Sequence, residues 1–368
     1  MDLKTAYYIG IMSGTSLDGI DAVLADFNSS PPSLLHTFYL PYDGELRSRL
    51  LDLNRSGNDE LHRAAMLGNE LARRYAEAVT GLLHGYGVKP QEVIAIGCHG
   101  QTVRHCPESG RGYTIQLCNP ALLVELTGIT VVADFRSRDI AAGGQGAPLV
   151  PAFHQILFKD SQVHRVITNI GGISNLTSLM PNGEVAGFDC GPGNLIMDAW
   201  CLRHTGKPYD ENGAWADSGK IIPELLEKLL GLQFFSLSPP KSTGREVFNL
   251  AWLESYLSGD EKPADVQATL LQLTVTGIAQ AVLTYFPDAA EIYLCGGGAR
   301  NAALVAQLRM ALSGRKVELT DRFGVDADWL EAFAFAWLAR QVILGVPSSL
   351  PAVTGARGAR LLGAIYPG

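Results

Sequence analysis

One acidic residue, Asp189, stands where a carboxylate could serve as a general base. It follows a strand-like segment, 185–188, and the rigid turn Gly-Pro-Gly-Asn comes shortly after it, at 191–194. A carboxylate aimed out of a sheet edge in this way can take a proton from a hydroxyl group or a water that attacks phosphorus or carbon. Two alternatives stay open: Asp189 caps the helix that follows, or Asp198 inside that helix is the acid.

A polar loop between two strand-like segments, 7–12 and 20–27, could bind phosphate. Its glycines let backbone N–H groups approach an anion, and its hydroxyl groups can donate to phosphate oxygens. Asp18, or alternatively Asp21, could hold Mg²⁺ directly or through water. No Gly-Lys-Ser/Thr follows, so this is not a Walker A loop, and an ordinary polar turn is the alternative. The predicted nucleotide-binding residues of this hairpin are Ser13, Gly14, Thr15, Ser16, Leu17, Asp18, Gly19 and Ile20.

Two more glycine-rich turns come at strand ends. Gly171-Gly172 forms a hairpin turn, and Gly296-Gly297-Gly298 joins a strand to a helix. Bare backbone at a helix N-terminus suits a nucleotide base or phosphate, although turns of this kind often carry glycine for structural reasons alone. Because three such loops occur in one chain, we expect them to hold the phosphates of a nucleotide.

A polar substrate could bind where other strands are expected to end. His99, Gln101 and Thr102 follow one buried strand, and Arg136 follows another. Arg, Gln and Thr side chains suit the hydroxyl groups and carboxylate of such a substrate. For His99, a structural, hydrogen-bonded role is the alternative to a catalytic base. Glu331, before an apolar run, is either an acid at a helix start or a substrate ligand.

These loops need strands and helices to position them, and the chain alternates the two throughout, which is typical of an α/β fold. Helices are predicted at 58–86, 121–127, 223–230, 251–257, 266–285 and 329–344. Both halves open with a strand, a Gly/Ser turn and a second strand, so we expect a distant duplication of one α/β unit, with a ligand cleft between the halves. We place the N-terminal domain at 1–133, joined by the C-terminal segment 352–368, and the C-terminal domain at 134–351.

The composition is that of a globular protein. The 368 residues exceed one domain of roughly 150 residues, and 47% apolar residues exclude an intrinsically disordered chain. The net charge of −8 argues against nucleic acid or an anionic membrane as partner. The six cysteines form no C-x-x-C pair and show no zinc spacing, so we expect a reduced interior without structural metal. No signal segment and no run of about 18 apolar residues is recognisable, and we expect a cytoplasmic location.

Several longer motifs resemble those of the anhydro-N-acetylmuramic acid kinases. The resemblance covers essentially the whole chain, in order, and several blocks are long enough to be specific. The blocks are IMSGTSLDG (11–19), HGQT (99–102), ADFR (133–136), AGGQGAPL (142–149), NIGGISN (169–175), FD with GPGN (188–194), PPKSTGRE (239–246) and CGGG (295–298).

The resemblance implies the fold of the sugar kinase, Hsp70 and actin superfamily, in which two duplicated actin-like (ribonuclease H-like) α/β domains are hinged around a nucleotide cleft. It also implies a bacterial enzyme of peptidoglycan recycling, a phosphotransferase with an alcohol group as acceptor. Such an enzyme uses ATP and Mg²⁺ to convert 1,6-anhydro-N-acetylmuramic acid and water into N-acetylmuramic acid 6-phosphate and ADP. Its partners would be this amino sugar and ATP, and the homodimer that we expect comes only from the resemblance.

The resemblance assigns roles that agree with the choice of Asp189. This residue becomes the base that activates water toward the anomeric carbon, while O6, released from the bridge, takes the γ-phosphoryl group. The hairpin at 13–20 would bind the ATP phosphates, and the turn at 295–298 would lie near the nucleoside. The polar residues selected above, from His99 to Glu331, become candidate sugar ligands.

Two positions depart from the family's pattern. The residue after the key aspartate is commonly Thr and here is Cys190, so a hydroxyl donor to substrate or phosphate is absent. Where relatives tend to have Gln-Ile-Gly-Asp, this chain has Gln116-Leu117-Cys118-Asn119. Because Asn caps a helix as well as Asp does, we expect little loss from this second change.

Other functions fit only parts of the sequence. A nucleotide-dependent binding or chaperone-like protein on the same fold would leave the blocks at 99–102 and 142–149 unexplained. A catalytically dead sugar sensor would have lost the acid at 189, which is present. A glycosidase working through two carboxylates would leave the phosphate-binding loops without a role.

Overall fold

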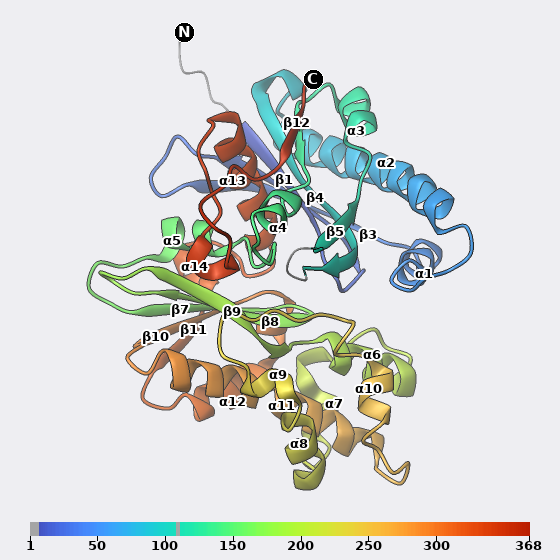
Figure 1. Cartoon of the computed structure of the whole chain (residues 1–368), viewed down its shortest axis with the longest axis vertical. Coiled ribbons are helices and arrows are strands. Elements are labelled where there is room, and N and C mark those ends of the chain that lie inside the picture. The colour runs from blue at the N-terminus through green and yellow to red at the C-terminus, as the bar shows by residue number, and fades with distance from the viewer. Residues whose placement is uncertain (1–6, 108–110) are drawn as a thin grey trace. The chain divides into compact units, whose positions relative to one another are not determined.

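The computed structural model describes residues 7–107 and 111–368, and the chain divides into two compact units (Figure 1). Unit 1 comprises Met1–Leu157 and Trp329–Gly368, and unit 2 comprises Phe158–Asp328. The units change at 157/158 and 328/329, whereas the domain boundaries predicted from the sequence lie at 133/134 and 351/352. The boundary at 328/329 lies before the predicted one at 351/352 because α13 (Leu330–Ile343) packs against strands of unit 1.

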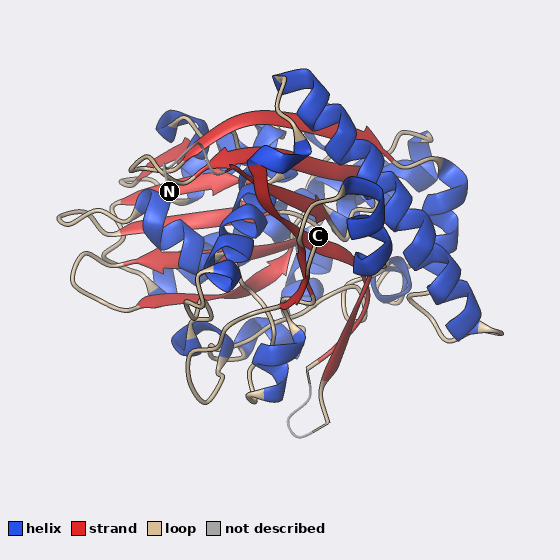
Figure 2. Ribbon diagram, turned by 90° about the horizontal axis from the view of Figure 1, so that it is seen from above, coloured by secondary structure: helices blue, strands red, loops and turns tan. Residues whose placement is uncertain are grey.

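Unit 1 contains a seven-stranded sheet in the order β12-β6-β4-β1-β2-β3, with β5 paired to β4. β1, β2 and β3 are antiparallel neighbours, β4 and β6 run parallel to β1, and β12 closes the edge antiparallel to β6. Figure 2 shows these strands in red between blue helices. Their bounds are β1 (Tyr7–Ser13), β2 (Gly19–Asp26), β3 (Ser33–Pro41), β4 (Val93–Cys106), β5 (Tyr113–Leu117), β6 (Val131–Ala133) and β12 (Ala364–Tyr366).

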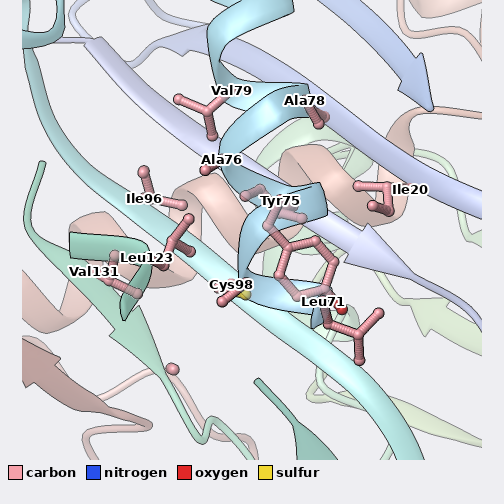
Figure 3. Packing of buried hydrophobic residues seen from close by; sticks show 14 of the residues in the cluster. Ile20, Leu71, Tyr75, Ala76, Ala78, Val79, Ile96, Cys98, Leu123 and Val131 are labelled. Atoms are coloured by element: carbon pink, nitrogen blue, oxygen red, sulfur yellow. The ribbon is translucent and has the colours of Figure 1, made fainter. Parts of the chain in front are cut away.

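The long helix α2 (Glu60–Tyr86) covers one face of this sheet. Its apolar residues recur at steps of three and four, as predicted for 58–86, and Leu71, Tyr75 and Val79 are buried. They pack in one core with Ile96 and Cys98 of β4 (Figure 3). Burying each Leu or Val side chain in such a core contributes about 1.5–3 kcal/mol.

The helix α13 lies against β1 and β4 with almost no space between the backbones. Gly10 in β1 and Gly97 in β4 make this approach possible, because a Cβ atom at Gly10 would overlap the carbonyl oxygen of Ala332 and one at Gly97 the carbonyl oxygen of Phe335. These two glycines are therefore required by the packing of α13.

The remaining helices of unit 1 are short. In α3, Asn119 accepts the backbone N–H of Leu122 and Pro120 is the first helical residue, which confirms the predicted cap. Asn in place of the family's usual Asp therefore keeps the capping bond. The helices are α1 (Gly44–Asp52), η1 (Pro90–Glu92), α3 (Pro120–Thr127), α4 (Ser137–Ala141), α5 (Pro151–Phe158), which ends at the change of unit, and α14 (Pro351–Thr354).

Unit 2 contains a five-stranded sheet in the order β11-β10-β7-β8-β9. β7, β8 and β9 are antiparallel neighbours, and β10 and β11 run parallel to β7. The strands are β7 (Arg165–Ile170), β8 (Ile173–Leu179), β9 (Val185–Pro192), β10 (Glu291–Cys295) and β11 (Lys316–Leu319). When β5, which lies off the main path, and the edge strand β12 are set aside, both units have the order third-second-first-fourth-fifth along the chain, with the same strand directions. The predicted duplication is thereby confirmed, and the chain has an actin-like fold of two ribonuclease H-like units.

The helix α11 (Pro263–Tyr285) is the central helix of unit 2 and contacts β8, β9 and four other helices of that unit. By length and composition it could span a membrane, although the sequence was expected to contain no such segment. However, 78% of its most apolar 18-residue stretch is buried inside the structure. It is a core helix. The others are α6 (Leu195–Thr205), η2 (Glu211–Gly213), α7 (Ala214–Asp217), α8 (Pro223–Leu230), α9 (Gln233–Ser236), α10 (Leu250–Glu254), η3 (Gly297–Arg300), α12 (Ala302–Ala311) and η4 (Thr320–Phe323).

Candidate active site

Asp189 lies inside β9, not after it as predicted, because the strand continues to Pro192. Its side chain is 7% exposed. The backbone N–H of Thr243 donates to its Oδ2 at 2.9 Å, and its own backbone N–H donates to the carbonyl oxygen of Lys241 at 3.1 Å. The segment 241–243 therefore holds Asp189 by both its main chain and its carboxylate.

The helix-cap alternative for Asp189 does not fit the structure. The residue that precedes α6 is Asn194, five residues further on, and the side chain of Asn194 makes no capping hydrogen bond. Asp198, the alternative acid, lies in the first turn of α6, where its backbone N–H donates to the carbonyl oxygen of Asn194. The carboxylate of Asp189 is oriented by a backbone donor outside its own strand, the N–H group of Thr243.

Cys190 is buried, and its Sγ donates to the backbone carbonyl oxygen of Ser174 in β8 at 3.2 Å. Burial raises the pKa of this thiol, with the charge of Asp189 acting in the same direction, so the thiol stays neutral. A threonine hydroxyl at this position could make the same bond to the Ser174 carbonyl. The departure from the family's pattern is therefore compatible with an intact strand.

Within unit 2, the glycine turn at 171–172 meets the Gly-Pro-Gly-Asn turn at 191–194. The turn Gly171-Gly172 accepts the backbone N–H groups of Gly193 and Asn194, at 2.9 Å and 2.8 Å. A Cβ atom at Gly193 would overlap the carbonyl oxygen of Gly171, so only glycine allows this contact. The β7–β8 turn and the start of α6 thus form one continuous backbone surface.

The turn Gly296-Gly297-Gly298 joins the same surface from β10. Gly296 has a φ of +79°, and a Cβ atom there would overlap Oδ1 of Asn169. A Cβ atom at Gly298 would lie 2.9 Å from Oδ1 of Asn194. The amides of Asn169 and Asn194 therefore border the glycine turn, and sequence reasoning had not selected either residue. In the sequence, these two residues stand out only because Asn169 begins one glycine-rich motif and Asn194 ends another.

In unit 1, the predicted hairpin connects β1 to β2. Ser13, its first residue, is 1% exposed. Its hydroxyl donates to the carbonyl oxygen of Gly100 at 3.1 Å and lies 2.8 Å from the hydroxyl of Tyr75. Because Ser13 has one hydroxyl proton, Tyr75 is the donor of the second bond. The hydroxyl is thus engaged within the protein, and only main-chain groups of Ser13 remain for a phosphate.

The outer part of the hairpin carries the other predicted side chains. Leu17 is buried with a φ of +57° and anchors the loop, while Thr15 and Asp18 are exposed. Ser16 donates its hydroxyl proton to Oδ1 of Asp18 at 2.7 Å. Residues 7–107 and 111–368 contain no group of three or more metal-ligating side chains. A Mg²⁺ ion at Asp18 would therefore take most of its oxygen ligands from phosphate and water, which suits this ion.

His99 and Gln101 lie inside β4, whereas the sequence placed them in a loop after it. Gly100, with a φ of +75°, lets the strand bend and continue to Cys106. Gln101 is fully buried, and its Nε2 donates to the carbonyl oxygen of Gly14 at 2.9 Å. Thr102 accepts a hydrogen bond from Nε2 of Gln116. Gln101 thus connects the predicted sugar block to the hairpin.

Arg136 follows β6, as predicted, and points at His99. Its Nε and Nη2 lie 3.1 Å and 2.8 Å from Nε2 of His99, and its Nη1 donates to the carbonyl oxygen of Gly146 at 2.8 Å. Burial, and then the charge of Arg136, lower the pKa of His99 well below its ordinary value. Since its Nε2 lone pair accepts from Arg136, His99 is a neutral positioning residue in this structure and has no free lone pair for a general base.

Acid is expected to destabilise unit 1, because His99 and His154 are buried and His105 is half-buried, all three in their neutral form. Burial lowers the pKa of His105 to about 4 and of His154 to about 3, and His99 shifts the same way. The unfolded chain binds these protons near pH 6.5, so stability falls as the pH falls below that value, by about 2 kcal/mol for each group at pH 5. Urea unfolding at pH 7.5 and pH 5.0 measures this loss, and His154→Gln should reduce it. Equal stability at both pH values would contradict the expectation.

Asp139 is a buried carboxylate that sequence reasoning had not selected. Its Oδ2 accepts the backbone N–H of Gly146, and its Oδ1 accepts the hydroxyl of Thr354, both at 2.8 Å. It thereby fixes the glycine-rich loop at 142–149 to α14. Glu331, the last predicted sugar ligand, lies half-buried in the first turn of α13.

Comparisons with known proteins show the family of this chain. The sequence model of the family described as anhydro-N-acetylmuramic acid kinase matches residues 6–368. A relative of that name in Nitrosospira multiformis is 71% identical over 99% of this chain and 100% of its own, and one in Nitrosomonas europaea is 64% identical over 98% and 99%. Among solved structures, an activator of 2-hydroxyisocaproyl-CoA dehydratase from Clostridium difficile with bound ADPNP matches 94% of this chain and 99% of its own, at 12% identity and a TM-score of 0.47. The family match spans nearly every residue, and the chain belongs to the anhydro-N-acetylmuramic acid kinase family.

Proposed function

We propose that this protein is an anhydro-N-acetylmuramic acid kinase of bacterial cell-wall recycling. It opens the 1,6-anhydro bridge of its sugar with water and transfers the γ-phosphoryl group of ATP to O6, giving N-acetylmuramic acid 6-phosphate and ADP. The observation that carries the proposal is the family match over residues 6–368, together with 71% identity to a relative of that name. The retention of Asp189 and its backbone donor supports it.

In the proposed mechanism, Asp189 removes a proton from a water molecule while the water oxygen attacks the anomeric carbon C1. The C1–O6 bond breaks as the new C1–O bond forms, and O6 leaves with the electron pair. O6 then attacks the γ-phosphorus, and ADP departs with the electrons of the bond to its bridging oxygen. The proton on Asp189 passes to solvent after the reaction. The Thr243 N–H keeps the carboxylate oriented toward the water during these steps.

We assign ATP binding to backbone groups on both units. In unit 1, main-chain groups at the tip of the hairpin at 13–20 and the hydroxyl of Thr15, an exposed residue, suit phosphate oxygens. In unit 2, the glycine turn 296–298 leaves bare backbone against which a nucleoside can lie. Asp18 is the residue proposed to hold Mg²⁺, which when bound neutralises charge on the β- and γ-phosphates.

For the sugar, we propose Arg136 as the main charged ligand. Its guanidinium is the natural partner of the lactyl carboxylate of a muramic acid, and His99 and the Gly146 carbonyl fix its orientation. Thr102 and Glu331 are proposed to contact sugar hydroxyl or amide groups, and Gln101, which is fully buried, is proposed to act on the sugar site through its bond to Gly14.

We also propose that the protein works in the cytoplasm as a homodimer. Both properties rest on the family resemblance. Light scattering on the purified protein tests the dimer, because a homodimer has twice the chain mass of 39.5 kDa.

The proposed function is tested by ADP release from ATP and Mg²⁺ with and without 1,6-anhydro-N-acetylmuramic acid. We expect release only in the presence of the sugar, together with a product whose mass equals the sugar plus one water and one phosphoryl group. ADP release that is indifferent to the sugar would instead favour a nucleotide-driven binding or chaperone-like protein. Wild-type protein that binds the sugar without releasing ADP would indicate a sensor.

A further inference from the structure

Lys241 is a buried lysine beside the proposed base, and the mechanism above gives it no role. The residue is 8% exposed. Its Nζ donates to the carbonyl oxygen of Phe234 at 3.2 Å and lies 3.5 Å from that of Phe235, both in α9. The same ammonium lies 4.7 Å from the ring centroid of Phe234 and 5.9 Å from that of Phe188. A buried ammonium group is costly, so its retention at this place calls for an explanation.

The backbone around Lys241 contacts Asp189 at two points. The Lys241 carbonyl oxygen accepts the backbone N–H of Asp189, so one backbone hydrogen bond joins this segment to β9. Two residues later, the Thr243 N–H donates to the Asp189 carboxylate. A displacement of this segment would therefore move both the strand position and the hydrogen-bond donor of the proposed base.

Packing around this segment is incomplete on one side. A cavity of about 400 Å³ adjoins Lys241 and Cys190 on the side of α11 and is also lined by Phe235, Gln280 and Thr284. Because side chains leave this space unfilled, the segment lacks van der Waals support there. The directed bonds of the ammonium group to α9 supply a fixed anchor in its place.

Burial and neighbouring groups act on the charge of Lys241 in opposite directions. Burial lowers the pKa of Lys241, and the negative charges of Cys190, were it ionised, and Asp189 act in the opposite direction. From α11, Tyr285 is the one titratable residue that lines the cavity, and α9 presents carbonyl groups and aromatic rings. Because the Cys190 thiol is neutral, Asp189 is the charged one of the two groups whose negative charge would raise the pKa of Lys241.

We propose that Lys241 is a positioning residue for catalysis: it anchors the segment 239–245 to α9 and so fixes the Thr243 N–H and the carboxylate of Asp189. This inference rests on the proposed role of Asp189 as the base. The positive charge also stabilises the deprotonated carboxylate, which is the form that accepts a proton from water. Lys241 touches neither the water nor the sugar in this scheme and acts through Asp189.

The test compares Lys241→Met with Lys241→Arg in full-length protein. Lys241→Met is expected to lower kcat by about 10–100-fold, since small misplacements of a catalytic group have effects of this size, with KM for ATP unchanged within about threefold. The acid limb of its pH–kcat profile is expected to move to higher pH, because an anion that loses a nearby cation binds a proton more easily. Lys241→Arg keeps the charge and has the cavity to accommodate its larger head, so it should restore the acid limb and most of kcat. Lys207→Met, at an exposed lysine of the same unit, is the control and should behave as wild type.

A merely structural Lys241 would give a different result. Lys241→Met would then melt earlier while the folded fraction kept the wild-type kcat and acid limb, and this outcome would overturn the proposal. Should Lys241→Met not fold, Lys241→Gln replaces it, because its amide can keep a bond to the Phe234 carbonyl without the charge. The acid limb is still expected to move, and an unmoved limb would count against the proposal. Failure of the proposed function itself is recognised separately, because wild-type protein would then show no sugar-dependent ADP release.

Discussion

Asp189→Asn is expected to lower kcat for sugar-dependent ADP release by about 10²–10⁴-fold, which is the range that general acid–base catalysis supplies. The amide is almost the same size as the carboxylate but cannot take a proton from water. Its oxygen can still accept the Thr243 N–H, so β9 and the segment next to it should keep their structure. Steady-state kinetics measures the loss, and calorimetric titration with the sugar should show binding close to that of the wild type.

Asp198→Asn provides a matched control for this prediction. Asp198 is an acid of the same unit and was the alternative candidate from the sequence, but it lies in the first turn of α6. We expect its replacement to change kcat by less than about threefold, with at most a modest loss of helix stability from the weakened dipole interaction. If Asp198→Asn abolished activity while Asp189→Asn did not, the assignment of the base would be wrong.

Gly10→Ala is expected to destabilise unit 1 by about 3 kcal/mol or more, the upper range for overpacking in a core. The added methyl group would overlap the carbonyl oxygen of Ala332 and would lie 2.7 Å from the backbone nitrogen of Ala336. Both atoms belong to the backbone of α13, so no side-chain rotation can relieve the overlap. Either β1 or α13 would have to move, and chemical denaturation should show a lower transition midpoint.

Gly44→Ala is the matched control. Gly44 is the first residue of α1, has no heavy atom within 4 Å of a Cβ atom built on it, and has no positive φ. Alanine favours helix over glycine by up to about 1 kcal/mol, so this variant should be as stable as the wild type or slightly more stable. Equal unfolding midpoints for Gly10→Ala and Gly44→Ala would contradict this prediction, because they would show that β1 and α13 accommodate the added methyl group.

The periodic segments of the fold could be predicted from sequence, because hydrophobic spacing records which face of a helix is buried. The helix expected at 223–230 is confirmed by α8, and those at 58–86, 266–285 and 329–344 by α2, α11 and α13, with ends shifted by three residues or fewer. The end of β4 was predicted wrongly. Its polar second half, from His99 onward, has the composition of a loop, and its pairing with β5 and, at Gln101, with β1 makes it a strand.

The types of the candidate site residues could also be predicted, but not their partners. Nothing in the spacing of Ser13 and Tyr75 indicates that their hydroxyl groups meet, because they are 62 residues apart and belong to a strand and a helix. The bond between Arg136 and His99 likewise depends on how β6 and β4 align in the sheet. Lys241 lay in a motif that resemblance had marked, yet its contacts with α9 exist only in the folded unit.

The division of unit 1 into two stretches of sequence has a consequence for synthesis on the ribosome. β1 and β4 leave the ribosome early, whereas α13, which covers their glycine-bearing face, begins only at Leu330. At 5–20 residues per second, the roughly 220 residues between Cys106 and Leu330 take about 10–45 s to translate. During that interval unit 2, which is continuous in sequence, can complete its core, while the nascent sheet of unit 1 keeps an apolar face open to solvent. An apolar face that is exposed in this way favours aggregation of the nascent chain, and an mRNA change that slows translation between these points would lengthen its exposure.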